Sequence, residues 1–315
     1  MSFSKPSTVA RLNDVILGCF GRVKPSETLD HLVRFLGTWS GSDKLFMVAQ
    51  YVIKLVVPFL RLRARLQHRA GLRLEPTSCS ADGYAKLDSL LGDSRTLWRF
   101  WGLLPIFQWL ISLERNPQPT RNLHVIERLQ GWAMLAYYPL EHLSYLGSHG
   151  ILPSTIKNPL SIVSKRKFIN LDPSVLGLWS CRFWAVYVFL QFAHLHEDRQ
   201  LLQLRQKALR KAKGTGLTPS EKQELAQRWD AWWSEVVVNL GYLPLTIHWS
   251  LKQGLFKDDI WIAAFGLVAG VTSFRSGWRA TAPPSSSSAV PTSTSTSGKT
   301  DGTGPSEPTG YDVSS

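Results

Sequence analysis

Titratable side chains gather at one point of the sequence, His194-Leu195-His196-Glu197-Asp198. In a helix His194 and Asp198 share a face, and imidazole and carboxylate groups on one face can hold a metal ion. The interpretation that we favour is a polar helix end at a membrane boundary. The sequence therefore indicates no metal site and no cofactor.

The signatures of the common enzyme classes are missing. The sequence has no His-Glu-x-x-His, no Gly-x-Ser-x-Gly, no Walker loop and no Gly-x-Gly-x-x-Gly. The cysteines Cys19, Cys79 and Cys181 are odd in number and widely spaced, which indicates neither a disulfide framework nor a zinc site. We expect a protein that is not an enzyme.

The composition points towards a membrane surface. Of 315 residues, 44% are apolar and only 19% are charged, the net charge is +13, and there are 13 tryptophans. Tryptophan is enriched at membrane–water boundaries. Basic side chains also neutralise nucleic-acid phosphates, but no zinc finger, RNA-recognition signature or Gly-rich loop accompanies them. We therefore expect no nucleic-acid partner.

Residues 44–74 are predicted to form a basic amphipathic helix. No acidic residue occurs between Asp43 and Glu75. At about 100° per residue, one face of this helix is cationic and the other is apolar. The cationic face carries Lys54, Arg61, Arg65, Arg69 and Arg73, and the apolar face carries Val52, Leu55, Val56, Phe59, Leu60, Leu62 and Leu66.

Such a helix suits the plane of an anionic membrane. Its apolar face would sink beneath the headgroups, and each Lys or Arg adds about 1 kcal/mol of attraction to acidic lipid. Pro58 would kink the helix, and Arg63 interrupts the apolar face. The alternative is a surface helix packed on its own domain, with solvated arginines.

Two further segments are long and apolar. Residues 174–195 carry one formal charge, Arg182, and residues 260–274 carry none. Each is either a membrane segment or a buried core helix. The second contains Gly266 and Gly270, a GxxxG spacing that lets two helix backbones approach closely. We expect these glycines to mediate oligomerisation.

The fold class predicted from these patterns is all-α. We expect a membrane-associated helical bundle with a basic amphipathic helix, one or two hydrophobic membrane segments and a disordered C-terminal tail. The proline-rich break at 116–119 divides an N-terminal region, 1–113, from a C-terminal region, 114–279. Thr218-Pro219-Ser220-Glu221 predicts the start of a helix through a capping box. Residues 280–315 are rich in Ser, Thr, Pro and Gly and form the predicted tail.

Two blocks of the sequence resemble the peroxin 11 family of peroxisomal membrane proteins. The first is Ser40-Gly41-x-Asp43-Lys44 followed by Gln50-Tyr51 and the basic helix. The second is Asp93-Ser94-Arg95-Thr96-Leu97-Trp98-Arg99-Phe100-Trp101-Gly102-Leu103-Leu104-Pro105. The glycine-bearing segment at 260–274 stands where the family has its last membrane segment. The resemblance covers about residues 1–280. Within the family, the chain resembles a divergent, fungal-type paralogue.

The resemblance implies a peroxisomal membrane protein that elongates the membrane before fission and promotes proliferation. It also implies self-association and cooperation with dynamin-type fission machinery. In this reading Lys54, Arg61, Arg65 and Arg69 contact lipid headgroups, and Leu55, Phe59, Leu62 and Leu66 form the wedge. The rival hypothesis is a membrane channel or metabolite carrier, motivated by the several apolar segments and by Arg182.

Overall fold

The computed structural model describes residues 23–157, 168–213 and 218–282, together with residues 12, 15–18, 21 and 216. The described chain is helical almost throughout, which confirms the predicted all-α class. Apart from loops, the other described structure is a pair of three-residue strands, β1 (Thr155–Lys157) and β2 (Phe168–Asn170), which form a small antiparallel ladder with Ile156 opposite Ile169.

Helices α2 to α9 succeed one another along the chain, and a short 3₁₀ helix, η2 (Arg99–Gly102), joins α4 to α5. Their bounds are α2 (Glu27–Leu36), α3 (Trp39–Arg69), α4 (Cys79–Trp98), α5 (Leu103–Arg115), α6 (Arg121–Ser148), α7 (Pro173–Lys213), α8 (Pro219–Ser250) and α9 (Asp259–Ala280).

The helix starts follow ordinary capping chemistry. The hydroxyl of Thr38 accepts a hydrogen bond from the backbone N–H of Gly41, so α3 begins at Trp39 and includes five residues before the predicted start. The predicted capping box at α8 is confirmed, because the Thr218 hydroxyl accepts from the Glu221 backbone while the Glu221 carboxylate accepts from the Thr218 backbone N–H.

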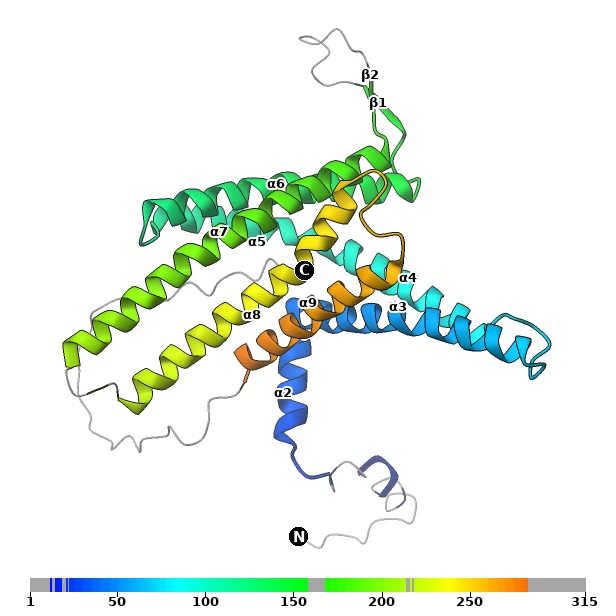
Figure 1. Cartoon of the computed structure of the whole chain (residues 1–315), viewed down its shortest axis with the longest axis horizontal. Helices are drawn as coiled ribbons and strands as arrows, with labels where there is room; N and C mark the ends of the chain where they lie inside the picture. Colours follow the sequence, from blue (N-terminus) through cyan, green and yellow to red (C-terminus); the bar gives the residue numbers. More distant parts are fainter. Residues whose placement is uncertain are drawn as a thin grey trace, which may run out of the picture.

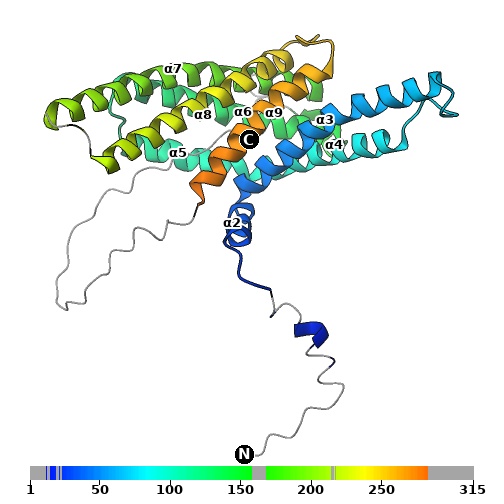
Figure 2. The ribbon, with the colours of Figure 1, turned by 60° about the horizontal axis from the view of Figure 1, so that its bottom comes forward.

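Helices α7, α8 and α9 lie side by side in both views of the molecule (Figures 1 and 2). Their shared core contains Val188 from α7, Leu245 from α8 and Ala263 from α9. The start of α3 completes this core with Met47 and Tyr51. A second, smaller core lies between α5 and α6, around Ile106 and Met134, so helices of both predicted regions belong to one packed body.

Helix α3 packs closely on α9 because α9 has glycines at the crossing. A Cβ atom at Gly266 would lie 2.3 Å from the ring carbon Cζ of Tyr51, and one at Gly270 would lie 3.3 Å from Cγ of Met47. The predicted close approach is thus made within one chain. Both glycines are covered by α3 of the same chain. Oligomerisation through them stays a prediction.

Beyond the contact with α9, α3 continues with α4 as a helical hairpin that extends away from the bundle (Figures 1 and 2). Val57 and Ala64 of α3 are buried on the side of α4, whose Ala81 is also buried. Helix α3 ends at Arg69, before the predicted end of the amphipathic segment at 74, and Gly71 follows in a left-handed conformation with φ of 72°.

Two other boundaries differ from the sequence-based expectation. The apolar segment 174–195 and the basic residues after it form one continuous helix, α7. Helix α9 runs to Ala280, past the predicted segment 260–274 and into the first residue of the predicted tail. Residues 283–315 of that tail lie outside the described residues.

Among the described residues, three helices are long and apolar enough to cross a membrane: α3, α7 and α9. We expected one or two such segments, at 174–195 and 260–274. The third is the amphipathic helix itself, because one stretch of 18 residues within it is apolar enough to qualify.

The glycine contact generates a test of the packing. Gly266→Ala should lower the melting temperature of the detergent-purified chain, because the added Cβ must displace the Tyr51 ring; overpacking of this kind costs about 1–3 kcal/mol. Gly83→Ala in α4 is the matched control, since a Cβ there meets nothing within 4 Å, and removal of a helical glycine should stabilise by up to about 1 kcal/mol. Equal melting temperatures for the two variants would contradict the α3–α9 contact.

Candidate membrane interface

Helix α3 meets different surroundings on its different sides. One side packs on α9 through Met47 and Tyr51, and a second packs on α4 through Val57 and Ala64. The apolar side predicted from the sequence points away from α4. No described part of the chain covers it beyond the contact with the bundle.

The exposed apolar residues of α3 extend along most of its second half. Phe59 is 65% exposed, Leu62 49% and Leu66 54%. Val56 and Val52 are exposed as well, about one and two turns before Phe59. Leu55 differs from the other predicted wedge residues, because it is half-buried against the core of the bundle. We call Val52, Val56, Phe59, Leu62 and Leu66 the apolar surface of α3.

The cationic side of α3 is less free than the sequence suggests, because α4 places acidic residues beside it. The guanidinium of Arg61 lies 3.4 Å from the carboxylate of Asp82. Lys54 lies over the Tyr51 ring, 5.9 Å from its centroid, and its charge also acts on Asp88. Burial raises the pKa of Asp88, while the charge of Lys54 and a hydrogen bond from Gln50 oppose that shift.

The side chains of Arg65 and Arg69 are accessible to an acidic partner outside the chain. Both are exposed, and within the described part of the chain neither forms an ion pair. The Nε–H of Arg65 donates only to the backbone carbonyl of Arg61, at 3.4 Å. Of the four predicted headgroup contacts, these two are therefore the ones best placed to meet an acidic surface.

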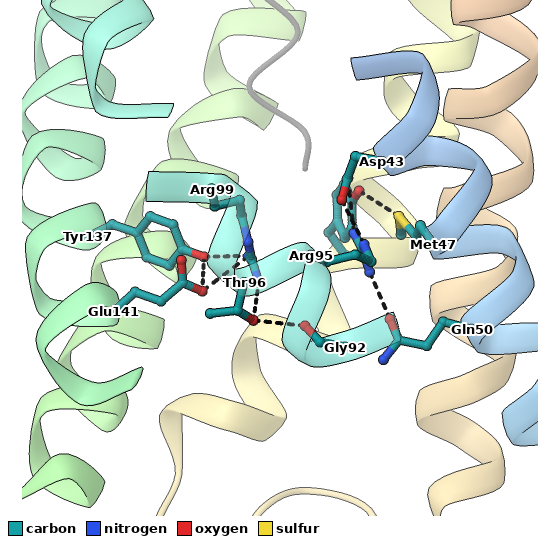
Figure 3. A network of polar contacts seen from close by, with 10 residues as sticks. Asp43, Met47, Gln50, Gly92, Arg95, Thr96, Arg99, Tyr137 and Glu141 are labelled. Carbon is teal, nitrogen blue, oxygen red and sulfur yellow. Dashed lines mark hydrogen bonds and ion pairs between the residues drawn. The ribbon is translucent and has the colours of Figure 1, made fainter. Parts of the chain in front are cut away.

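A buried ion pair fixes α4 against α3 (Figure 3). The Arg95 guanidinium donates to both carboxylate oxygens of Asp43, from Nε at 2.9 Å and from Nη2 at 3.2 Å, and its Nη1 donates to Gln50 at 3.0 Å. Burial alone would lower the pKa of Arg95, but the Asp43 carboxylate outweighs this effect and raises it.

One turn later, Arg99 makes the equivalent connection to α6 (Figure 3). Its guanidinium lies 3.1 Å from the Glu141 carboxylate and donates to the Tyr137 hydroxyl at 2.9 Å, while that hydroxyl donates to Glu141 at 2.7 Å. Burial disfavours the charged form of Arg99, yet Glu141 holds the arginine pKa above its ordinary value. Burial raises the pKa of Tyr137 well above normal.

Asp43, Gln50, Arg95 and Arg99 belong to the two sequence blocks that carry the family resemblance, and the α6 residues of the second network lie outside these blocks. The roles of these residues were not predicted. Asp43 and Gln50 stand seven residues apart, which places them on the same face of a helix. Polar residues at this spacing in an apolar segment were the feature of the sequence that could have indicated a buried polar contact. Their partner is more than forty residues away in the sequence, so the sequence alone did not identify it.

The His194 cluster is a structural contact in the middle of α7. Its imidazole Nε2 lies 3.1 Å from the Glu127 carboxylate of α6 and its Nδ1 lies 3.0 Å from Asp198. The cluster is thus not a helix end, although it is polar as expected. No group of metal ligands occurs among the described residues.

The buried ion pair can be tested by truncation. Asp43→Ala leaves the Arg95 charge buried beside Gln50 alone and should destabilise the protein by about 3–5 kcal/mol. Asp82→Ala, which removes the exposed partner of Arg61, should cost at most about 1 kcal/mol. Thermal unfolding of the purified chain checks both. The double variant Asp43→Leu/Arg95→Met should recover much of the loss; if it does not, the pair is not the cause.

Two of three comparisons with known proteins find similar sequences. A sequence model of the family "Peroxisomal biogenesis factor 11 (PEX11)" matches residues 29–278. A Schizosaccharomyces pombe protein described as uncharacterised is 26% identical over 203 residues, which are 64% of this chain and 80% of that protein. Peroxisomal membrane protein 11B of Arabidopsis thaliana is 28% identical over 138 residues, 44% of this chain and 54% of its own. No solved structure matches.

The family match begins within α2 and ends in the last turn of α9, and it includes both buried networks and the apolar surface of α3. The structure agrees with a membrane protein, because three of its described helices are long and apolar enough to cross a bilayer. The chain therefore belongs to the peroxisomal biogenesis factor 11 family and is a protein of the peroxisomal membrane.

Proposed function

We propose that this protein elongates the peroxisomal membrane by inserting the apolar surface of α3 into the cytosolic leaflet, so promoting peroxisome proliferation and fission. The observation that carries the proposal is the uncovered state of that surface. In water, five exposed apolar side chains on one helix are unfavourable. Among lipid acyl chains the same side chains are stabilised.

The magnitudes indicate that the apolar side chains contribute more than the charges. Full burial of a Leu, Val or Phe side chain contributes about 1.5–3 kcal/mol, whereas each arginine near an acidic membrane contributes about 1 kcal/mol. Because Asp82 and Asp88 lie beside Arg61 and Lys54, Arg65 and Arg69 would supply most of the electrostatic attraction. Arg63, exposed within the apolar surface, can extend its charged end towards the headgroups.

The attachment of α3 gives the wedge a fixed base. Tyr51 is held against Gly266 of α9, and Asp43 is held by Arg95 of α4. A wedge that is anchored in this way expands one leaflet without leaving the membrane. Elongation by many copies requires self-association, which we propose as well. We further propose that fission follows through a dynamin-type GTPase.

The apolar surface can be tested by substitution in the full chain. Replacing Phe59, Leu62 and Leu66 with Gln should abolish peroxisome elongation in cells that lack the endogenous protein, while the variant still reaches peroxisomes through α7 and α9. The matched control is Leu87→Gln/Leu90→Gln, which changes exposed leucines of α4. Peroxisome length and number are the measurements. Normal elongation by the α3 variant would refute the proposal.

The electrostatic contribution has a separate test. Arg65→Glu/Arg69→Glu should weaken binding of the purified chain to vesicles containing acidic lipid and should reduce its salt dependence. Neutral vesicles should show a smaller change. Arg61→Glu alone also places a like charge beside Asp82, so its effect should include a loss of stability. A channel or carrier, the alternative function, would keep its conductance in the Arg65/Arg69 variant and would conduct without tubulating the vesicles.

A further inference from the structure

We propose that α8 crosses the bilayer in contact with lipid, between α7 and α9, so that the chain segments at its two ends lie on opposite sides of the membrane. This inference goes beyond the proposed function and does not rest on insertion of α3. The average hydropathy of α8 does not place it among the candidate membrane-spanning helices. Its case rests on how its side chains are distributed.

Between Val236 and Ile247 the polar side chains of α8 all face inwards. Asn239, Tyr242 and Thr246 are buried, and each finds a partner inside the protein. Asn239 donates to the Glu235 carbonyl at 2.8 Å, Tyr242 to the Met47 sulfur at 3.4 Å, and Thr246 to the Leu243 carbonyl at 2.8 Å. None of these three groups needs water.

The side chains of this section that are exposed or half-buried are all apolar. They are Val236, Val237, Leu240, Leu243, Pro244 and Ile247. A helix on the surface of a water-soluble bundle shows the reverse arrangement, with its polar residues outside. Apolar side chains outside and satisfied polar groups inside are the arrangement that a bilayer requires.

Aromatic and charged residues mark both ends of this apolar section. At one end Trp249 of α8 stacks near Trp184 of α7, and Arg182 of α7 donates to the backbone carbonyl of Ser250 and lies 4.7 Å from the Trp179 ring. At the other end the Trp232 indole donates to the Leu195 carbonyl of α7 at 2.9 Å, and Asp230 pairs with Arg279 of α9. Such residues anchor helices at membrane–water boundaries.

The spacing of these ends fits a bilayer. At 1.5 Å per residue, the interval Trp233–Trp249 in α8 is about 24 Å long and the interval Trp261–Trp278 in α9 is about 26 Å. The hydrocarbon core of a membrane is about 30 Å thick, and somewhat less in thin membranes. The two helices therefore have sections of matching length between their tryptophans.

Packing joins the three helices along this section. A Cβ atom at Gly241 of α8 would lie 2.9 Å from both the Cβ of Ala269 and the carbonyl oxygen of Phe265 in α9. On its other side α8 meets α7, where the Trp184 ring lies 5.5 Å from that of Tyr242. If α7 and α9 cross the bilayer, α8 cannot remain outside it. The α7–α8 connection and the end of α9 then share one side, and residues 251–258 lie on the other.

Cysteine labelling on isolated peroxisomes tests this arrangement. In the full chain with Cys19, Cys79 and Cys181 replaced by Ser, single cysteines are placed at Ser220, Gln253 and Ala282, all exposed. A membrane-impermeant maleimide is applied before and after detergent treatment. We expect Ser220→Cys and Ala282→Cys to behave alike and Gln253→Cys to behave oppositely. If Ser220→Cys and Gln253→Cys are both labelled, or both protected, in intact organelles, α8 does not cross.

Lipid contact is tested by a matched pair of substitutions. Leu240→Arg places a charge in the middle of the apolar section, whereas Leu204→Arg changes a leucine on the part of α7 beyond it; the two leucines are 52% and 61% exposed. Arginine at the centre of a membrane helix is strongly disfavoured. We expect Leu240→Arg to reduce the carbonate-resistant fraction several-fold and Leu204→Arg to leave it unchanged. Equal fractions for the two variants would overturn the proposal.

Discussion

The ion pair between Asp43 and Arg95 is the interaction on which the position of α3 depends. Arg95 and Arg99 stand one turn apart at the junction of α4 and η2, and they reach in opposite directions, to α3 and to α6. One turn of chain thereby joins the α3–α4 hairpin to the α6–α7 part of the bundle. A buried ion pair adds little net stability, but its geometry is demanding. Rotation of α4 about its own axis would break both connections.

The direction of the apolar surface of α3 follows from this constraint. With Asp43 and Gln50 held by Arg95, and Tyr51 held against Gly266, two sides of α3 are fixed against α4 and α9. The side that carries Phe59, Leu62 and Leu66 is left outward. The wedge that we propose needs such a face in a constant orientation. Here the orientation is set by buried polar groups rather than by the apolar residues themselves.

The sequence predicts the local features of this fold well and its long-range contacts poorly. The capping box at Thr218, the break after Arg115 and the two faces of α3 all depend on neighbouring residues, and the structure has each of them. The GxxxG spacing at Gly266 correctly indicates close helix packing, but a spacing pattern does not say which helix approaches. The partner is α3 of the same chain, and nothing near Gly266 in the sequence identifies Tyr51.

The acidic residues of α4 illustrate the same limit. Residues 44–74 contain no Asp or Glu, so the sequence alone predicts a cationic face of α3 that has no acidic neighbour. Asp82 and Asp88 are brought beside Arg61 and Lys54 only when α4 folds back along α3. Of the four predicted headgroup contacts, the tertiary structure places acidic side chains beside Arg61 and Lys54 and leaves Arg65 and Arg69 without an ion pair in the described part of the chain.

Helix α8 shows why an average along the sequence can miss a membrane helix. A hydropathy average gives Asn239 and Thr246 the same weight as Leu240, although the first two are buried and hydrogen-bonded within the protein and only the third meets the surroundings. The free energy of a helix in lipid depends on what its outer face exposes. For a helix packed between two apolar neighbours, the inner face can be polar without cost as long as each polar group is paired. The outer face of α8 therefore decides where it lies, and between Val236 and Ile247 that face is apolar throughout.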